Sequence, residues 1–233
     1  MRVENFFGRL VNIGSLREEE IGTLYSFIKE DGDNYAEMKN FVELTKDRKV
    51  LFDVGCAHGD FCLAFCDTED KMAYGFDAAH QTQLAIIENI ALNPKMRIQY
   101  NKLFLGDKDA IISYNSKTEN ALAVPGEDRV IMLQMDSFCA LTNARPDTIK
   151  IDTEGFEYNV LAGARGVITE CKPLMFIELH PKFTGMYGTH IGQVFDIAKE
   201  LNYSIKGING ENVVLEMILQ SDKESVRTVW RPR

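Results

Sequence analysis

The chain has 233 residues, of which 45% are hydrophobic and 26% are charged, a composition typical of globular proteins. Its formal charge of −9 disfavours binding along a nucleic-acid backbone, which requires a basic surface. We expect no membrane span and no signal peptide, because no segment approaches the ~20 apolar residues that cross a bilayer and the N-terminal stretch lacks an apolar core.

Residues 1–48 are predicted to form an N-terminal helical appendage. Ser15 and Glu18 fit a capping box, in which each side chain satisfies a free backbone donor of the other. Apolar residues then follow at helical spacing from Ile21 to Ile28, and a second helix is expected to begin near Tyr35.

Residues 49–233 are predicted to form one domain in which short apolar strands alternate with helices. Strands are expected at 50–55, 72–79, 97–107, 110–115, 130–135, 148–152 and 174–180. Segments 204–208 and 213–219, joined by Asn209-Gly210, predict a closing β-hairpin. The pattern predicts an α/β fold with a doubly wound, mostly parallel sheet and a C-terminal antiparallel hairpin.

The cysteines form an odd set of five, which favours reduced thiols and a cytoplasmic location. Cys56, Cys62 and Cys66 lie close together in sequence, but no nearby Cys–His pattern completes a zinc site. We therefore expect buried thiols and assign no metal to them.

Acidic residues and glycines gather at the predicted carboxyl ends of the strands, where ligands of such sheets bind. Asp53 lies just before the glycine loop of residues 55–59, and an acid at this place suits a ligand with positive charge. Asp77 follows the next strand, where it either accepts hydrogen bonds from a ribose or caps the following helix. Together these features point to S-adenosylmethionine, and the predicted cofactor-binding residues are Asp53, Gly55, Cys56, Gly59, Asp77 and Asp152.

Residues 146–183 closely resemble the signature of FkbM-type methyltransferases, K-[IL]-D-x-E-G-x-E, then L-x-G-A, then P-x-x-x-x-E-x-H-P. The resemblance extends upstream through "LFDVGCAHG" and "YGFDAA" and covers roughly residues 50–205. The matching residues are Lys150, Asp152, Glu154, Gly155, Glu157, Leu161, Gly163, Ala164, Pro173, Glu178, His180 and Pro181.

The resemblance implies a Rossmann-like class I fold and transfer of a methyl group from S-adenosylmethionine, commonly to a hydroxyl of a sugar or natural product. The chain departs from the family pattern at Ala57, where an asparagine is usual, so any contact of that amide is absent. It also has Asp77-Ala78 where the family often has Glu-Pro, and the shorter acid must lie closer to a ribose.

His180 is the candidate general base, because its unperturbed pKa near 6.5 suits proton acceptance at neutral pH. Glu178, two positions earlier, is predicted to orient it or stabilise its charge. Asp152 is the alternative base. The alternative for His180 is a purely structural role, in which it stabilises the turn at Pro181.

The remaining candidates line the same strand ends. Glu154, His180 and Tyr187 are predicted to contact the acceptor, and loops 115–129 and 182–190 are expected to shape its specificity. Glu157 is explained by the dipole of the following helix. A divalent cation on Asp152, Glu154 and His180 is an alternative that we do not assign.

The predicted function is O-methylation of a small or carbohydrate-like acceptor by in-line displacement. Two alternatives stay open. One is N-methylation, or modification of a peptide or nucleic-acid end. The other is a catalytically silent module that senses S-adenosylmethionine.

Overall fold

The computed structural model describes residues 3–12, 16, 18–28, 32–78, 80–115, 122 and 126–233. Ser15 of the predicted capping box and most of the loop 115–129 lie outside the described residues.

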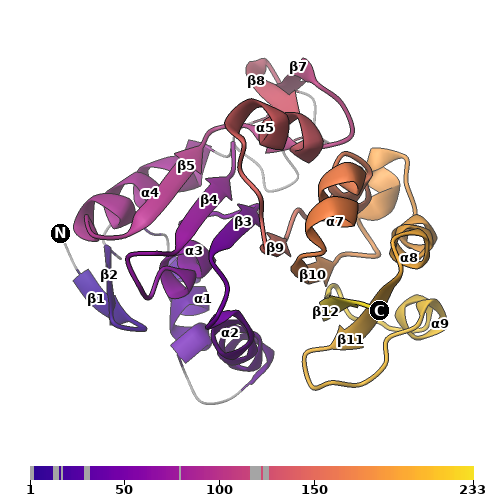
Figure 1. The fold of residues 1–233 in the computed structure, drawn as a ribbon, viewed down its shortest axis with the longest axis horizontal. Coiled ribbons are helices and arrows are strands. Elements are labelled where there is room, and N and C mark those ends of the chain that lie inside the picture. The colour runs from indigo at the N-terminus through magenta and orange to yellow at the C-terminus, as the bar shows by residue number, and fades with distance from the viewer. Residues whose placement is uncertain are drawn as a thin grey trace.

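A seven-stranded sheet forms the centre of the molecule, with the strand order β11-β12-β10-β9-β3-β4-β5 (Figure 1). The five strands from β10 to β5 are parallel to one another, whereas β12 is antiparallel to both β10 and β11. The strand order reverses between β3 and β9, because the chain first extends the sheet to β5 and later resumes on the other side of β3. The strands are β3 (Val50–Val54), β4 (Met72–Phe76), β5 (Arg97–Asn101), β9 (Thr148–Ile151), β10 (Leu174–Leu179), β11 (Tyr203–Gly207) and β12 (Val226–Pro232).

Helices cover both faces of this sheet, which confirms the doubly wound α/β prediction. Alternate strand residues point to opposite faces, so Phe52 and Ile177 pack with the later helices while Leu51 and Phe176 pack with the earlier ones. Figure 1 shows the earlier helices on one side and the later ones on the other. The earlier helices are α1 (Glu18–Ile28), α2 (Gly32–Thr45), α3 (Asp60–Phe65) and α4 (His80–Leu92). The later ones are α5 (Met135–Thr142), α6 (Glu157–Ala162), α7 (Arg165–Cys171), α8 (Ile191–Glu200) and α9 (Leu215–Leu219).

Among the described helices, none combines the length and the apolar character that crossing a membrane requires.

The N-terminal segment contains the two predicted helices and, before them, a hairpin that the sequence analysis did not predict. Strand β1 (Val3–Phe6) pairs antiparallel with β2 (Arg9–Asn12). Phe6 from the hairpin and Phe41 from α2 are buried in the same cluster as Phe176 of the central sheet. These elements therefore contribute to the layer that covers one face of the sheet.

A small separate sheet branches off before α5. The predicted strand 97–107 divides into β5 and β6 (Phe104–Leu105), and β6 pairs with β8 (Asp128–Leu133) beside β7 (Ala110–Tyr114). The predicted helical stripe after Glu157 also divides, into α6 and α7. The two helices separate around Gly163, where an added Cβ would lie 1.9 Å from the carbonyl oxygen of Gly106.

The prediction that residues 213–219 form the last strand is wrong, because Leu215–Leu219 forms the short helix α9. The antiparallel partner of β11 is instead β12, near the C-terminus. Trp230 of β12 is fully buried in the main core cluster. Burial of this large apolar side chain favours β12 over residues 213–219 as the strand that joins the sheet. The C-terminal antiparallel pair exists, but with a later strand.

A buried lysine occupies the face of the sheet that lies under α2. Lys150 on β9 is 1% exposed, and its Nζ lies 3.2 Å from Glu37, 3.5 Å from Asp152 and 3.9 Å from Glu178. Arg227 of β12 joins the same network by contacting Glu37 and Glu178. Burial alone lowers the pKa of Lys150, but the attraction of Glu37, Asp152 and Glu178 outweighs it and raises the pKa above its usual value. The ammonium group therefore stays charged inside the protein.

A buried carboxyl group lies beside this lysine. Asp53 on β3 is paired in register with Lys150 and accepts a hydrogen bond from the thiol of Cys62 at 3.3 Å. Burial raises the pKa of Asp53 to about 7, assisted by the charges of Asp152 and Asp60 and opposed by Cys62 and Lys150. Asp53 therefore gains its charge near neutral pH, well above the usual value of 3.8.

Replacing Lys150 by Met is expected to destabilise the protein by about 3–5 kcal/mol, because it leaves buried carboxylates without their cation. Denaturant unfolding measures the change. Lys49→Met is the matched control, since Lys49 pairs with Asp70 on the surface and its loss should change stability little. Adding Glu37→Gln to Lys150→Met should recover part of the loss, and equal stability of wild type and Lys150→Met would contradict this account.

The raised pKa of Asp53 predicts a pH-dependent stability. The pKa of Asp53 is about 7 in the folded protein and 3.8 in the unfolded chain. The stabilising contribution of the protonated Asp53 to the free energy of unfolding is therefore complete below pH 3.8 and is lost as the pH rises to 7. The free energy of unfolding of the wild type should thus fall, relative to that of Asp53→Asn, by on the order of 2 kcal/mol between pH 5 and pH 7. Denaturant titrations of both proteins at the two pH values test this, and parallel pH profiles would contradict it.

Candidate active site

The loops that follow β3 and β9 meet at the point where the strand order reverses. The backbone amide of Asp152 donates a hydrogen bond to the carbonyl of Val54 at 2.9 Å. A Cβ added to Gly55 would lie 1.8 Å from the carbonyl oxygen of Asp152. Only glycine permits this approach, and its φ of +80° is also one that glycine adopts readily. The close contact brings the glycine loop and the acidic loop into one site.

The glycine loop turns through three left-handed residues, Gly55, Ala57 and Gly59, before α3 begins. The backbone amide of Ala57 donates to the carboxylate of Asp77 at 2.9 Å, which ties the loop to the end of the next strand. Asp77 is half-buried at this position. The structure therefore brings Gly55, Gly59 and Asp77 together, as the sequence predicts.

Two predicted cofactor-binding side chains are enclosed beneath this loop. Asp53 is 1% exposed and Cys56 is 5% exposed. An added Cβ at Gly75 would lie 2.9 Å from the Sγ atom of Cys56, so this thiol packs tightly against β4. Burial raises the pKa of the Cys56 thiol well above its usual value. The side chains of Asp53 and Cys56 therefore support the loop from below.

His180 follows β10 and is held by a carboxylate that the sequence analysis had explained otherwise. Its Nδ1 lies 3.0 Å from Oε1 of Glu157, which is fully buried at the start of α6. The same oxygen accepts the backbone amide of Gly155 at 2.9 Å. Because a carboxylate accepts hydrogen bonds, Nδ1 carries the proton and donates it to Glu157. Glu157 thus orients the imidazole, in addition to lying at a helix start.

The other nitrogen of His180 faces two further acids. Nε2 lies 3.5 Å from Glu154 Oε2 and 3.8 Å from Asp152 Oδ1. Burial lowers the pKa of His180, but the hydrogen bond that the imidazole donates to Glu157 and the charges of Asp152 and Glu154 outweigh it and raise the pKa to about 9. The imidazole of the ligand-free protein is therefore mostly protonated at neutral pH, unlike the ordinary histidine that the sequence analysis assumed.

Glu178 does not take the orienting role that was predicted for it. Its carboxylate accepts a hydrogen bond from Ser225 and lies 3.2 Å from Arg227, and it also faces Lys150. The group that orients His180 is Glu157 instead. Glu178 lies 3.9 Å from the ammonium group of Lys150, and Glu37 lies closer to it, at 3.2 Å.

The loop after His180 carries aromatic side chains that lie near the acidic cluster of Asp152, Glu154 and Glu157. The ring of Phe183 stacks on the imidazole with 6.0 Å between centroids, and Tyr187 meets Phe156 edge-on at 5.1 Å. Burial raises the pKa of the Tyr187 hydroxyl to about 12, and Glu157 and Glu154 add to the shift. Tyr187 therefore lies near Glu154 and Glu157, and its hydroxyl stays protonated at neutral pH.

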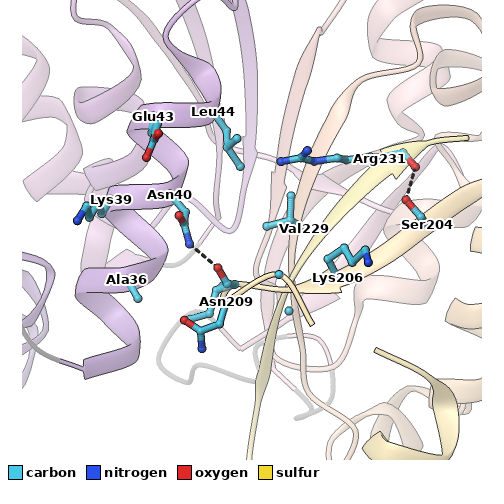
Figure 2. Close-up of a pocket in the computed structure, with 13 residues that line it drawn as sticks. Ala36, Lys39, Asn40, Glu43, Leu44, Ser204, Lys206, Asn209, Val229 and Arg231 are labelled. Carbon is cyan, nitrogen blue, oxygen red and sulfur yellow. Dashed lines mark hydrogen bonds between the residues drawn. The ribbon is translucent and has the colours of Figure 1, made fainter. Parts of the chain in front are cut away.

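A cleft of about 710 Å³ lies elsewhere, between α2 and the strands β11 and β12. Figure 2 shows Asn40 of α2 reaching toward the turn around Asn209, and Asn40 donates a hydrogen bond to the carbonyl of Ile208. Ser204 donates to the carbonyl of Arg231 across the neighbouring strands. None of the predicted site residues lines this cleft, so it is distinct from the site at the strand ends.

Comparison with solved structures supports the architecture. The chain is similar to the methyltransferase FkbM from Methylobacillus flagellatus KT, with 15% identity and a TM-score of 0.51 over 91% of this chain. The chain spans 59% of the length of that protein. An S-adenosylmethionine-dependent methyltransferase from Clostridium acetobutylicum ATCC 824 has 7% identity and a TM-score of 0.50, covering 92% of this chain and 98% of its own. An rRNA methylase from Streptococcus thermophilus has 7% identity and a TM-score of 0.53, covering 87% and 98%.

These similarities establish the fold, and the sequence itself identifies the family. The sequence matches none of the curated proteins with which it was compared. Residues 53–205 match the model of the methyltransferase FkbM domain. This range contains the glycine loop, Asp77 and the acidic cluster with His180, and it makes up more than half of the chain. The chain therefore belongs to the FkbM methyltransferase family.

Proposed function

We propose that the protein transfers a methyl group from S-adenosylmethionine to a hydroxyl oxygen of a small or carbohydrate-like acceptor. The observation that carries this proposal is the contact between Gly55 and Asp152. This contact joins the glycine loop to the loop that carries Asp152 and Glu154. The glycine loop is hydrogen-bonded to Asp77 and suits a nucleoside, whereas the acids beside His180 suit a hydroxyl.

The residues at the reversal of the strand order fit the donor. The tight turn through Gly55 and Gly59 lets a ligand approach the backbone, and Asp77 offers carboxylate oxygens to ribose hydroxyls. The backbone of Asp152 contacts the loop, and its partly exposed carboxylate suits a cationic ligand. When bound, S-adenosylmethionine supplies an electrophilic methyl group on a positively charged sulfur.

The acidic cluster fits the acceptor. Asp152 and Glu154 expose 32% and 37% of their side chains, whereas His180 behind them exposes only 4%. Asp152 and Glu154 are therefore the groups that meet an acceptor hydroxyl, and the proton of that hydroxyl passes to Asp152, or to Nε2 of His180 once that nitrogen has lost its own proton. Glu157 fixes the imidazole so that Nε2 points to this place. Holding the acceptor in line with the methyl group lowers the barrier by several kcal/mol.

Asp77→Ala should weaken binding of S-adenosylmethionine by ten-fold or more, because hydrogen bonds to a charged group contribute about 1.5–3 kcal/mol each. Isothermal titration calorimetry with S-adenosylmethionine and its demethylated product measures the change. Asp70→Ala is the matched control, since Asp70 lies on the surface and pairs with Lys49. Equal affinities of Asp77→Ala and Asp70→Ala would contradict the assignment of Asp77.

His180→Ala should lower turnover by about 10²–10⁴-fold, the usual contribution of a group that handles a proton, and should leave donor affinity nearly intact. A labelled methyl donor offered to panels of sugars, phenols and amines measures turnover, and mass spectrometry locates the new methyl group. Methylation of nitrogen, or tight donor binding without transfer to any acceptor, would contradict the proposed reaction. Wild-type turnover by His180→Ala would remove the assigned role of His180.

A further inference from the structure

His180 lies beside a network in which five carboxylates accompany two fixed cations, Lys150 and Arg227. Arg227 pairs with Glu37 and Glu178, and Lys150 pairs with the same two acids and with one oxygen of Asp152. The other oxygen of Asp152 faces His180. The five carboxylates are those of Glu37, Asp152, Glu154, Glu157 and Glu178.

The distances from Nε2 of His180 to Asp152 and Glu154 do not match direct hydrogen bonds. A hydrogen bond between an imidazolium and a carboxylate is about 2.7–2.9 Å long. Nε2 of His180 lies 3.5 Å from Glu154 and 3.8 Å from Asp152, too far for either bond. Bonds of about 2.0–2.2 Å to a shared ion would place two ligand atoms about 3–4 Å apart, which matches both separations. One ligand atom from each of the three residues lies within 4.8 Å of the others.

The imidazole has the support that a metal-binding histidine requires. His180 is 4% exposed, its Nδ1 donates to the buried carboxylate of Glu157, and its Nε2 points between Asp152 and Glu154. A histidine that binds a metal through one nitrogen typically donates its other N–H to a carboxylate, which fixes the ring. This pairing does not involve Asp152 or Glu154, and it leaves Nε2, once it has lost its proton, as the nitrogen that can bind an ion.

We propose that Asp152, Glu154 and His180 bind one divalent cation of the Mg²⁺ or Mn²⁺ class. Two carboxylates and one imidazole suit Mn²⁺ well, because carboxylates favour hard cations and imidazole favours softer ones. Three protein ligands leave coordination positions open on the exposed side of the two acids. Resting on the proposed function, we place the acceptor oxygen at such a position, where the cation makes its proton easier to remove and a carboxylate oxygen of Asp152 or Glu154 that does not bind the cation accepts that proton.

Titration of metal-free, full-length protein with Mn²⁺, followed by calorimetry and electron paramagnetic resonance without donor or acceptor, tests the site. One Mn²⁺ per chain is expected, and Glu154→Gln and Asp152→Asn should each weaken binding at least ten-fold. Glu157→Gln, which removes the group that orients the ring, should weaken it about 10–100-fold. Glu170→Gln is the control, because Glu170 is exposed and pairs with Arg145. Absence of Mn²⁺ binding by the wild type, or the same affinity in Glu154→Gln and Glu170→Gln, would overturn the proposal.

Methyl transfer measured with and without Mn²⁺ separates this inference from the proposed function. A rate that depends on Mn²⁺ supports the placement of the acceptor oxygen. Mn²⁺ binding without methyl transfer to any acceptor supports the cation site and contradicts the proposed function. Methyl transfer by a protein that binds no Mn²⁺ supports the proposed function and contradicts the cation site. Methyl transfer at an unchanged rate after removal of bound Mn²⁺ overturns the catalytic role of the cation.

Discussion

The charge of Lys150 inside the sheet is the interaction on which the rest of the site depends. An ammonium group in a protein interior requires nearby carboxylates, and Glu37, Asp152 and Glu178 supply them from three different elements. The same group lies 4.9 Å from the ring centre of Phe61 on α3. One cation thus ties α2 to β9 and β10 and lies beside one oxygen of Asp152. The orientation of the acidic cluster follows from a charge that the core itself must satisfy.

The sequence pattern predicted the parallel sheet and the meeting of its strand ends. Alternation of apolar runs with helical stripes is a strong signal, because strands buried on both faces are nearly continuous in apolar residues. Once the strands are parallel, their carboxyl ends share an edge, which brings the glycine loop, Asp77, Asp152 and His180 together. The short segment 213–219 was the exception, since an apolar run of this length fits a helix as well as a strand.

The sequence pattern could not predict which side chains pair within the site. Glu157 and His180 are 23 positions apart, and Arg227 and Glu37 are 190 positions apart, so no local period connects them. Glu178 was expected to serve His180 because residues two apart on a strand share a face. His180 lies just past the end of β10, however, and there the backbone leaves the strand and turns the imidazole toward Glu157. Its pKa depends on these long-range neighbours and could not be assigned from the residue type.

The backbone of Ala57 links ligand binding to the shape of the glycine loop. Ala57 has a φ of +43°, a conformation that asparagine tolerates better than alanine, which pays about 1–2 kcal/mol for it. The asparagine usual in the family would hold this turn through its own conformational preference. Here the turn is held from outside, by the carboxylate of Asp77 that accepts the Ala57 amide. A nucleoside bound through Asp77 in the proposed way would share the carboxylate that secures the loop, so binding and loop shape would be energetically coupled.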